Sequence, residues 1–181
     1  MVAYLLLLVA VLSRVIPHAP WGNFTAVTGG LLYFGARRSW REMLIPIAAL
    51  IATDYYITVY ANHNIYPFHW QDYVFNWVAQ LATIPLGYLL LNKRTTFLRG
   101  AAGAILGPTL FFVVSNFGVW AGNLVQYPHT LAGLATCYVR AIPFYGNDLV
   151  ATSIVLGAVL GVPALVRRMN PNRGQEALAG K

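Results

Sequence analysis

Residues 100–120 read GAAGAILGPTLFFVVSNFGVW, an apolar run without a single charged side chain. A helix that crosses a bilayer needs about 20 mostly apolar residues, with roughly 17 to 25 tolerated. The run therefore predicts a transmembrane helix. Lys93, Arg94 and Arg99 precede it, and basic residues at the end of an apolar run are typical of a membrane protein.

Five other stretches predict helices of the same kind. They run from about Val2 to Ile16, Phe24 to Ala36, Met43 to Ala61, Tyr73 to Leu91 and Leu149 to Val166, and the first two are short. The stretch from Gln126 to Asn147 is less apolar and holds Arg140 and Pro143, which favours an outer re-entrant or interfacial segment. The predicted fold is all-α: a polytopic membrane helical bundle of about six transmembrane helices plus that outer segment. We expect residues 1–169 to form a single transmembrane domain and residues 170–181 a disordered cytoplasmic tail.

The charge distribution predicts how these helices are oriented. Of the 12 Lys and Arg residues, all but Arg14 and Arg140 fall into three clusters: Arg37/Arg38/Arg41, Lys93/Arg94/Arg99 and Arg167/Arg168/Arg173/Lys181. Lys and Arg in short loops are retained on the cytoplasmic side. Six crossings place all three clusters and both termini there, and they place residues 17–23, 62–72 and 121–148 outside.

The composition excludes several classes of protein. The chain is 58% hydrophobic and 9% charged, against roughly 25% charged residues in a soluble domain, so a water-soluble fold is excluded. The net charge of +7 lies at segment ends without a basic helix or an aromatic-lined basic face, which indicates contact with anionic lipid rather than nucleic acid. No hydrolase, phosphate-loop, zinc-protease or dinucleotide motif is present, so we expect neither an enzyme nor a cofactor.

Five charged residues lie at or near the predicted outer ends of the helices. They are Arg14, Asp54, Asp72, Arg140 and Asp148. A charge inside a span is costly and usually faces a cavity or a partner, which predicts an outward-open polar pocket covered by residues 121–148. An anionic substrate would use Arg14 and Arg140. The alternative is a structural ion pair of Asp54 with one of these arginines.

The candidate substrate-binding residues combine these charges with amides, aromatic rings and soft ligands of the outer segments. They are Arg14, His18, Asn23, Asp54, Asn116, Trp120, His129, Cys137, Tyr138, Arg140, Phe144 and Asn147. Asparagines would supply hydrogen bonds and aromatic rings a stacking surface, although an amide such as that of Asn116 can equally join two helices. Cys137 with His129 or His18 is a possible soft-metal site. A lone cysteine is more often a small packed residue, so we expect no metal.

Several motifs carry a resemblance to a known family. They are RVIPH (residues 14–18), NFT (23–25), Asp54, SNFGVW (115–120), Tyr127-Pro128, Gly133-Leu134, Cys137-Tyr138 and AIPF (141–144). Over residues 13–165 the chain resembles a family of small bacterial inner-membrane proteins of unknown function. That family is distantly similar to the substrate-binding S components of energy-coupling factor (ECF) transporters. The resemblance implies a bacterial inner-membrane protein with six helices and an outward-facing pocket.

Two functions follow as hypotheses. The first is substrate binding and uptake of a small nutrient such as a vitamin or cofactor precursor. The second is a non-catalytic structural or assembly subunit of a larger membrane complex. S components that dock a shared transport module carry small residues at four-residue spacing in their first helix, but residues 3–10 here read AYLLLLVA. That spacing occurs instead at Gly103/Gly107 and Gly157/Gly161, where it lets helices approach closely. The expected partners are the bilayer, a small-molecule ligand and a possible membrane protein.

Overall fold

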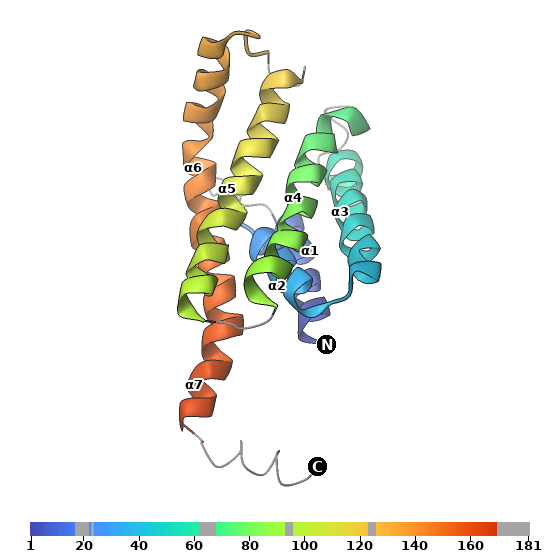
Figure 1. Ribbon diagram of the computed structural model, residues 1–181. Coiled ribbons are helices and arrows are strands. Elements are labelled where there is room, and N and C mark those ends of the chain that lie inside the picture. The colour runs from blue at the N-terminus through green and yellow to red at the C-terminus, as the bar shows by residue number, and fades with distance from the viewer. Residues whose placement is uncertain (17–21, 23, 62–67, 93–95, 123–125, 170–181) are drawn as a thin grey trace.

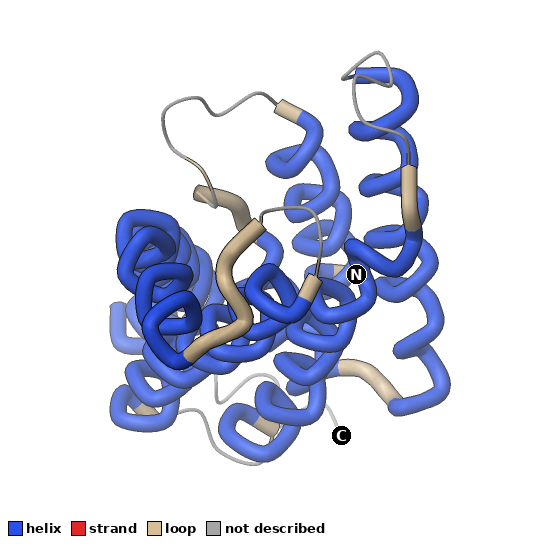
Figure 2. The backbone as a smooth tube through the Cα atoms, turned by 90° about the horizontal axis from the view of Figure 1, so that it is seen from above, coloured by secondary structure: helices blue, strands red, loops and turns tan. Residues whose placement is uncertain are grey.

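The computed structural model describes residues 1–16, 22, 24–61, 68–92, 96–122 and 126–169. These residues form helices and short connections without a strand (Figures 1 and 2). The helices are α1 (Val2–Val15), α2 (Val27–Arg37), α3 (Leu44–Tyr56), α4 (Trp70–Leu91), α5 (Phe97–Ala121), α6 (Leu131–Leu156) and α7 (Val162–Met169). Single turns η1 (Trp40–Met43) and η2 (Ile57–Ala61) extend α3 at its two ends, and η3 (Gly157–Gly161) makes α6 and α7 continuous.

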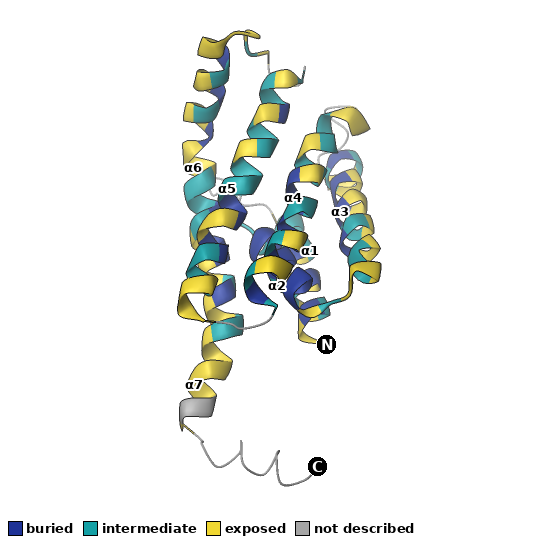
Figure 3. Ribbon diagram, in the orientation of Figure 1, coloured by how far each residue is buried: buried dark blue, intermediate teal, exposed yellow. Residues whose placement is uncertain are grey.

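Four continuous helices are long and apolar enough to cross a bilayer. They are Trp40–Ala61, Trp70–Leu91, Phe97–Ala121 and Leu131–Val166, and Val2–Val15 is a shorter apolar helix. Their outward faces are exposed and rich in large apolar side chains such as Leu89, Ile105 and Ile154 (Figure 3). Apolar surface this extensive is rare on soluble proteins and suits contact with lipid. The chain is a multi-pass membrane-spanning helical protein.

The predicted all-α membrane bundle is confirmed, and one segment of it is wrong. The expected outer segment of residues 126–147 does not exist as a separate element, because α6 begins at Leu131 and runs through Arg140 and Pro143. The Thr130 hydroxyl starts the helix by accepting a 3.1 Å hydrogen bond from the Gly133 amide. Arg140 and Pro143 both lie on the exposed side of α6, so neither disturbs its packed face.

Helix α2 forms the centre of the bundle. Nearly all its side chains are buried, and it contacts α1, α4, α5 and α6 (Figure 3). Its closest approach is to α4, where a Cβ on Gly35 would lie well under 3.0 Å from the Ile84 carbonyl oxygen, and a Cβ on Gly87 equally close to that of Leu32. Only glycine permits two backbones to meet this closely. The short, glycine-rich second helix is therefore the core of the fold.

The two glycine pairs singled out in the sequence differ in their surroundings. Gly107 packs against Leu32 and Thr28 of α2, so the pair with Gly103 lies inside the bundle. A Cβ on Gly157 or Gly161 would meet nothing within 4 Å. The first pair serves the packing of this chain, whereas the second faces away from it.

The basic residues of the described helix ends gather at one end of the bundle. Arg37 ends α2, Arg99 opens α5, and α7 projects from the same end (Figure 1). Arg38 is held there by an ion pair with Glu42, and its guanidinium carbon lies 4.8 Å from the centre of the Tyr4 ring. The expected cytoplasmic tail, residues 170–181, lies outside the described residues.

Candidate functional site

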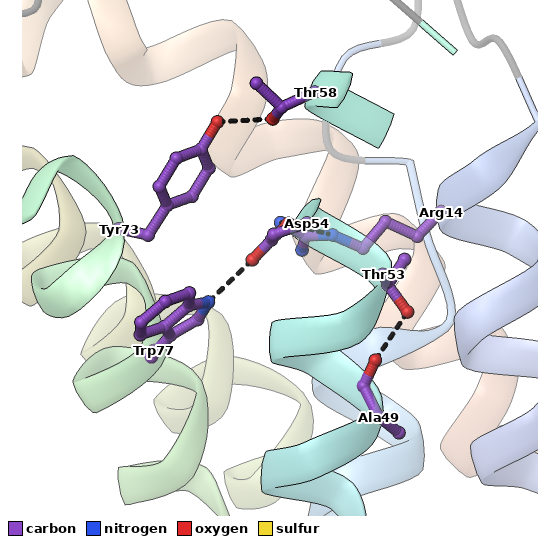
Figure 4. Close-up of polar contacts among 7 residues, drawn as sticks. All are labelled: Arg14, Ala49, Thr53, Asp54, Thr58, Tyr73 and Trp77. Carbon is purple, nitrogen blue, oxygen red and sulfur yellow. Dashed lines mark hydrogen bonds and ion pairs between the residues drawn. The ribbon is translucent and has the colours of Figure 1, made fainter. Parts of the chain in front are cut away.

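Three helices meet at Asp54, which is 3% exposed (Figure 4). Arg14 of α1 donates from Nε to Oδ1 at 3.0 Å, and its Nη2 donates to the same oxygen. Trp77 of α4 donates from Nε1 to Oδ2 at 2.7 Å. Both oxygens of the carboxylate are thus engaged by protein donors, and the network ties α1, α3 and α4 together.

This network bears on the two interpretations of Arg14. The ion pair with Asp54 was the structural alternative, and it is present. The Arg14 side chain is 19% exposed, and two of its nitrogens donate to the carboxylate. The arrangement satisfies a buried charge within the membrane protein and assigns Arg14 a structural contact.

A cavity of about 170 Å³ lies between α4, α5 and α6. Its wall includes Asn76 of α4, Ser115 and Asn116 of α5, and Phe144, Tyr145 and Asp148 of α6. Apolar walls with a few convergent polar groups are typical of small-molecule sites. The lining residues of α5, from Pro108 to Val119, belong to the half of that helix furthest from Arg99 and the basic end.

Asp148 is the one carboxylate on the described wall of the cavity, and it is 3% exposed. Its Oδ2 accepts a 3.0 Å hydrogen bond from the Thr28 hydroxyl of α2, and its Oδ1 a 3.2 Å bond from Thr152 one turn along α6. Asp148 takes part in neither of the two ion pairs found among the described residues. A carboxylate offers about four acceptor positions, so the two threonines leave part of its capacity unused.

The polar side chains near Asp148 donate hydrogen bonds to other groups of the protein. Ser115 donates to the Phe111 carbonyl at 2.7 Å, and Asn116 donates one amide proton to that of Phe112 at 2.8 Å. Thr109 gives its only proton to the Ile105 carbonyl, so Tyr145 must be the donor in the 2.9 Å bond between the two hydroxyls. The hydroxyls of Ser115 and Tyr145 therefore have no free proton, and the amides of Asn76 and Asn116 are the remaining donors among the polar side chains on the described wall.

The structure places the expected site residues in several different environments. Asn116 and Phe144 line the cavity. Cys137 is buried with its sulfur 3.4 Å from the Asn116 carbonyl oxygen, and the Tyr138 hydroxyl donates to the Val113 carbonyl at 2.7 Å. These last two residues join α6 to α5 beside the cavity.

The other expected residues are not among the described residues that line this cavity. The rings of Trp120 and His129 pack together with their centres 5.4 Å apart. The Asn147 amide donates a 2.9 Å hydrogen bond to the Gly22 carbonyl. Arg140 is exposed, with its guanidinium carbon 5.9 Å from the centre of the Tyr127 ring. His18 and Asn23 lie outside the described residues. A ligand-binding role for the twelve residues stays a prediction.

The soft-metal hypothesis joins Cys137 to His129 or His18, and His18 lies outside the described residues. No group of three or more His, Cys, Asp or Glu side chains comes together in the described part of the chain. Cys137 instead contacts a backbone carbonyl, as a small packed residue does.

Nine of the cavity residues were not among the expected site residues, and four of these carry polar side chains: Asn76, Ser115, Tyr145 and Asp148. Asp148 had been identified as a polar residue at the outer start of a span. It lies instead in the interior of the longer α6, one helical turn before Thr152. A carboxylate and a hydroxyl four residues apart share a helix face. Had the start of α6 been predicted correctly, this spacing would have identified Asp148 as a candidate site residue.

The sequence model of one family, described as a family of unknown function (DUF6580), matches residues 1–173. The chain belongs to DUF6580. This membership confirms the resemblance to an uncharacterised family, and it extends over all seven labelled helices. No curated protein and no solved structure matches the chain. Neither comparison assigns a function to this DUF6580 member.

Proposed function

We propose that this chain is an integral membrane substrate-binding protein, similar to an ECF S component, that serves uptake of a small nutrient such as a vitamin or cofactor precursor. The cavity between α4, α5 and α6 carries the proposal. It combines aromatic rings with a buried carboxylate, and an intramembrane ionisable residue beside a cavity is typical of a substrate path.

The orientation follows from charge. Under the positive-inside rule the end that carries Arg37, Arg38 and Arg99 faces the cytoplasm, which places both termini there and the lining half of α5 toward the outside. We assign the protein to a bacterial inner membrane, as the family resemblance implies. A cavity on that side would receive its ligand from outside the cell.

The proposed role is binding rather than catalysis. Cys137, the single cysteine, is buried against a backbone carbonyl, and the Asp54 carboxylate is occupied by Arg14 and Trp77. Neither group is arranged as a nucleophile or a general base for a bound molecule.

A second candidate is a structural or assembly subunit of a larger membrane complex. The observation that favours it is the far end of the long α6–α7 helix, where a Cβ on Gly157 or Gly161 would meet no atom of the other described helices within 4 Å. A stoichiometric membrane-protein partner in mild detergent, together with an empty cavity, would support this candidate instead.

Native mass spectrometry of the purified protein tests the first proposal. Ser115→Leu fills the cavity, and Ser153→Leu is its matched control because Ser153 makes the same 2.7 Å bond to the carbonyl four residues earlier but is exposed. We expect wild type and Ser153→Leu to retain a small molecule that Ser115→Leu loses. A molecule retained equally by all three proteins, or by none, would contradict the proposal.

A further inference from the structure

We infer that the cavity binds a small organic cation that carries N–H donors, such as a protonated amine. This inference rests on the proposed function and names its ligand class. It departs from the expectation of an anionic substrate, because the charges that line the cavity differ from those that the sequence suggested.

The charge on the cavity wall favours a cation. Asp148 is the only acidic or basic side chain on the described wall of the cavity. Arg14 is paired with Asp54, and Arg140 lies on the outer face beside Tyr127. A buried charge is stabilised by an opposite charge and by hydrogen bonds. The two threonines supply hydrogen bonds to Asp148, and a cationic ligand would supply the opposite charge.

Several polar groups on the cavity wall present acceptors to a ligand. The hydroxyl protons of Ser115 and Tyr145 and one amide proton of Asn116 are already donated within the protein. Their oxygens remain as acceptors around Asp148. An ammonium group presents three donors and no acceptor, so it complements these oxygens, whereas a carboxylate ligand would find side-chain donors on the described wall only in the remaining amide protons of Asn76 and Asn116.

A buried acceptor on α4 fits the same pattern. Gln80 is 2% exposed, and its Oε1 has no hydrogen-bond partner in the described structure. It follows the cavity residue Asn76 by four positions, so the two side chains share one face of α4. This side of the bundle thus holds a further acceptor without a donor.

Aromatic rings lie beside the carboxylate on the cavity wall. Phe111, Phe112, Phe144 and Tyr145 all line the cavity, and the rings of Phe112 and Tyr145 lie 4.9 Å apart. An aromatic face attracts a cation, more strongly when water is excluded. The volume of about 170 Å³ is below the range of roughly 300–1,000 Å³ of drug-sized sites, which limits the cation to a molecule smaller than a drug-sized ligand.

A series of near-isosteric probes tests the inference. We would titrate 2-phenylethylammonium, neutral 2-phenylethanol and anionic phenylacetate into the purified wild-type protein and follow heat of binding and thermal stability. The cation should bind at least tenfold more tightly than the other two. Asp148→Asn should abolish this preference. Asp72→Asn removes the same charge outside the cavity wall and should keep it.

The outcomes separate the inference from the proposed function. Equal or tighter binding of the alcohol or the acid to wild type, or an anionic or neutral molecule identified as the retained ligand, would overturn the cation and leave a substrate-binding protein. Failure of every probe, with no small molecule retained, would overturn both. If Asp148→Asn does not fold, the wild-type preference and the charge of the retained molecule still decide.

Discussion

The Thr28 hydroxyl of α2 donates a 3.0 Å hydrogen bond to Asp148 of α6, across 120 residues of sequence. Because α2 is buried among four other helices, this contact fixes the carboxylate from the centre of the bundle. The floor of the cavity is thus part of the core. A site built this way is held in place before a ligand arrives, which lowers the cost of binding.

Replacing Thr28 by Val should lower the free energy of unfolding by roughly 1.5–3 kcal/mol, because a buried carboxylate loses a hydrogen bond. Thr136→Val is the matched control, since the exposed Thr136 hydroxyl bonds only the Ala132 carbonyl of its own helix, and it should change stability by less than about 0.5 kcal/mol. Denaturant unfolding in detergent measures both. Equal losses of unfolding free energy in the two variants would show that the Thr28–Asp148 hydrogen bond contributes no more than the bond of Thr136 to its own helix.

Replacing Arg14 by Met should destabilise the fold by roughly 3 kcal/mol, because Asp54 would be left buried without its cation. The double variant Arg14→Met/Asp54→Leu removes both charges and should recover part of that loss. Ligand retention by the folded Arg14→Met protein should persist, since Arg14 lies outside the cavity wall. A folded Arg14→Met protein that no longer retains the ligand would show that Arg14 takes part in binding.

Gly87→Ala should disrupt the contact of α4 with α2, because its Cβ would overlap the Leu32 carbonyl oxygen. We expect a loss of at least roughly 3 kcal/mol, at the upper end for overpacking. Gly157→Ala adds the same methyl group where nothing lies within 4 Å and should be neutral within about 1 kcal/mol. Thermal unfolding of both variants measures the difference, and similar midpoints would refute the close approach.

The membrane orientation can be tested by labelling in a Cys137→Ala background. Ser39→Cys lies at the basic end of the bundle, and His129→Cys lies at the opposite end. A membrane-impermeant maleimide added to intact cells or spheroplasts should label the cysteine at position 129 and reach the one at position 39 only after lysis. Reversed labelling would place the cavity on the cytoplasmic side.

Much of the fold could be predicted because hydropathy and charge act locally. The predicted spans of residues 43–61, 73–91 and 100–120 agree closely with the helices of the structure. The start of α6 was missed because Arg140 and Pro143 make its first half look like a loop. Whether such residues face lipid, solvent or core depends on the neighbouring helices, which a single sequence does not reveal.

The candidate site was harder to predict for the same reason. Composition identified the charged residues, but their pairing depends on tertiary contacts between helices far apart in sequence, as between Arg14 and Asp54. Once that pair forms, the arginine expected to hold a substrate has a partner in the protein. Asp148 gains its role only when α2 brings Thr28 against it.

An experimental structure of the protein with its retained small molecule tests the central claim most directly. The account predicts density between α4, α5 and α6, with a donor of the ligand within hydrogen-bond distance of the Asp148 carboxylate and an aromatic ring of α5 or α6 against it. Density beside Arg140 on the outer face, or between α1 and α3 in place of the Arg14–Asp54 pair, would contradict it.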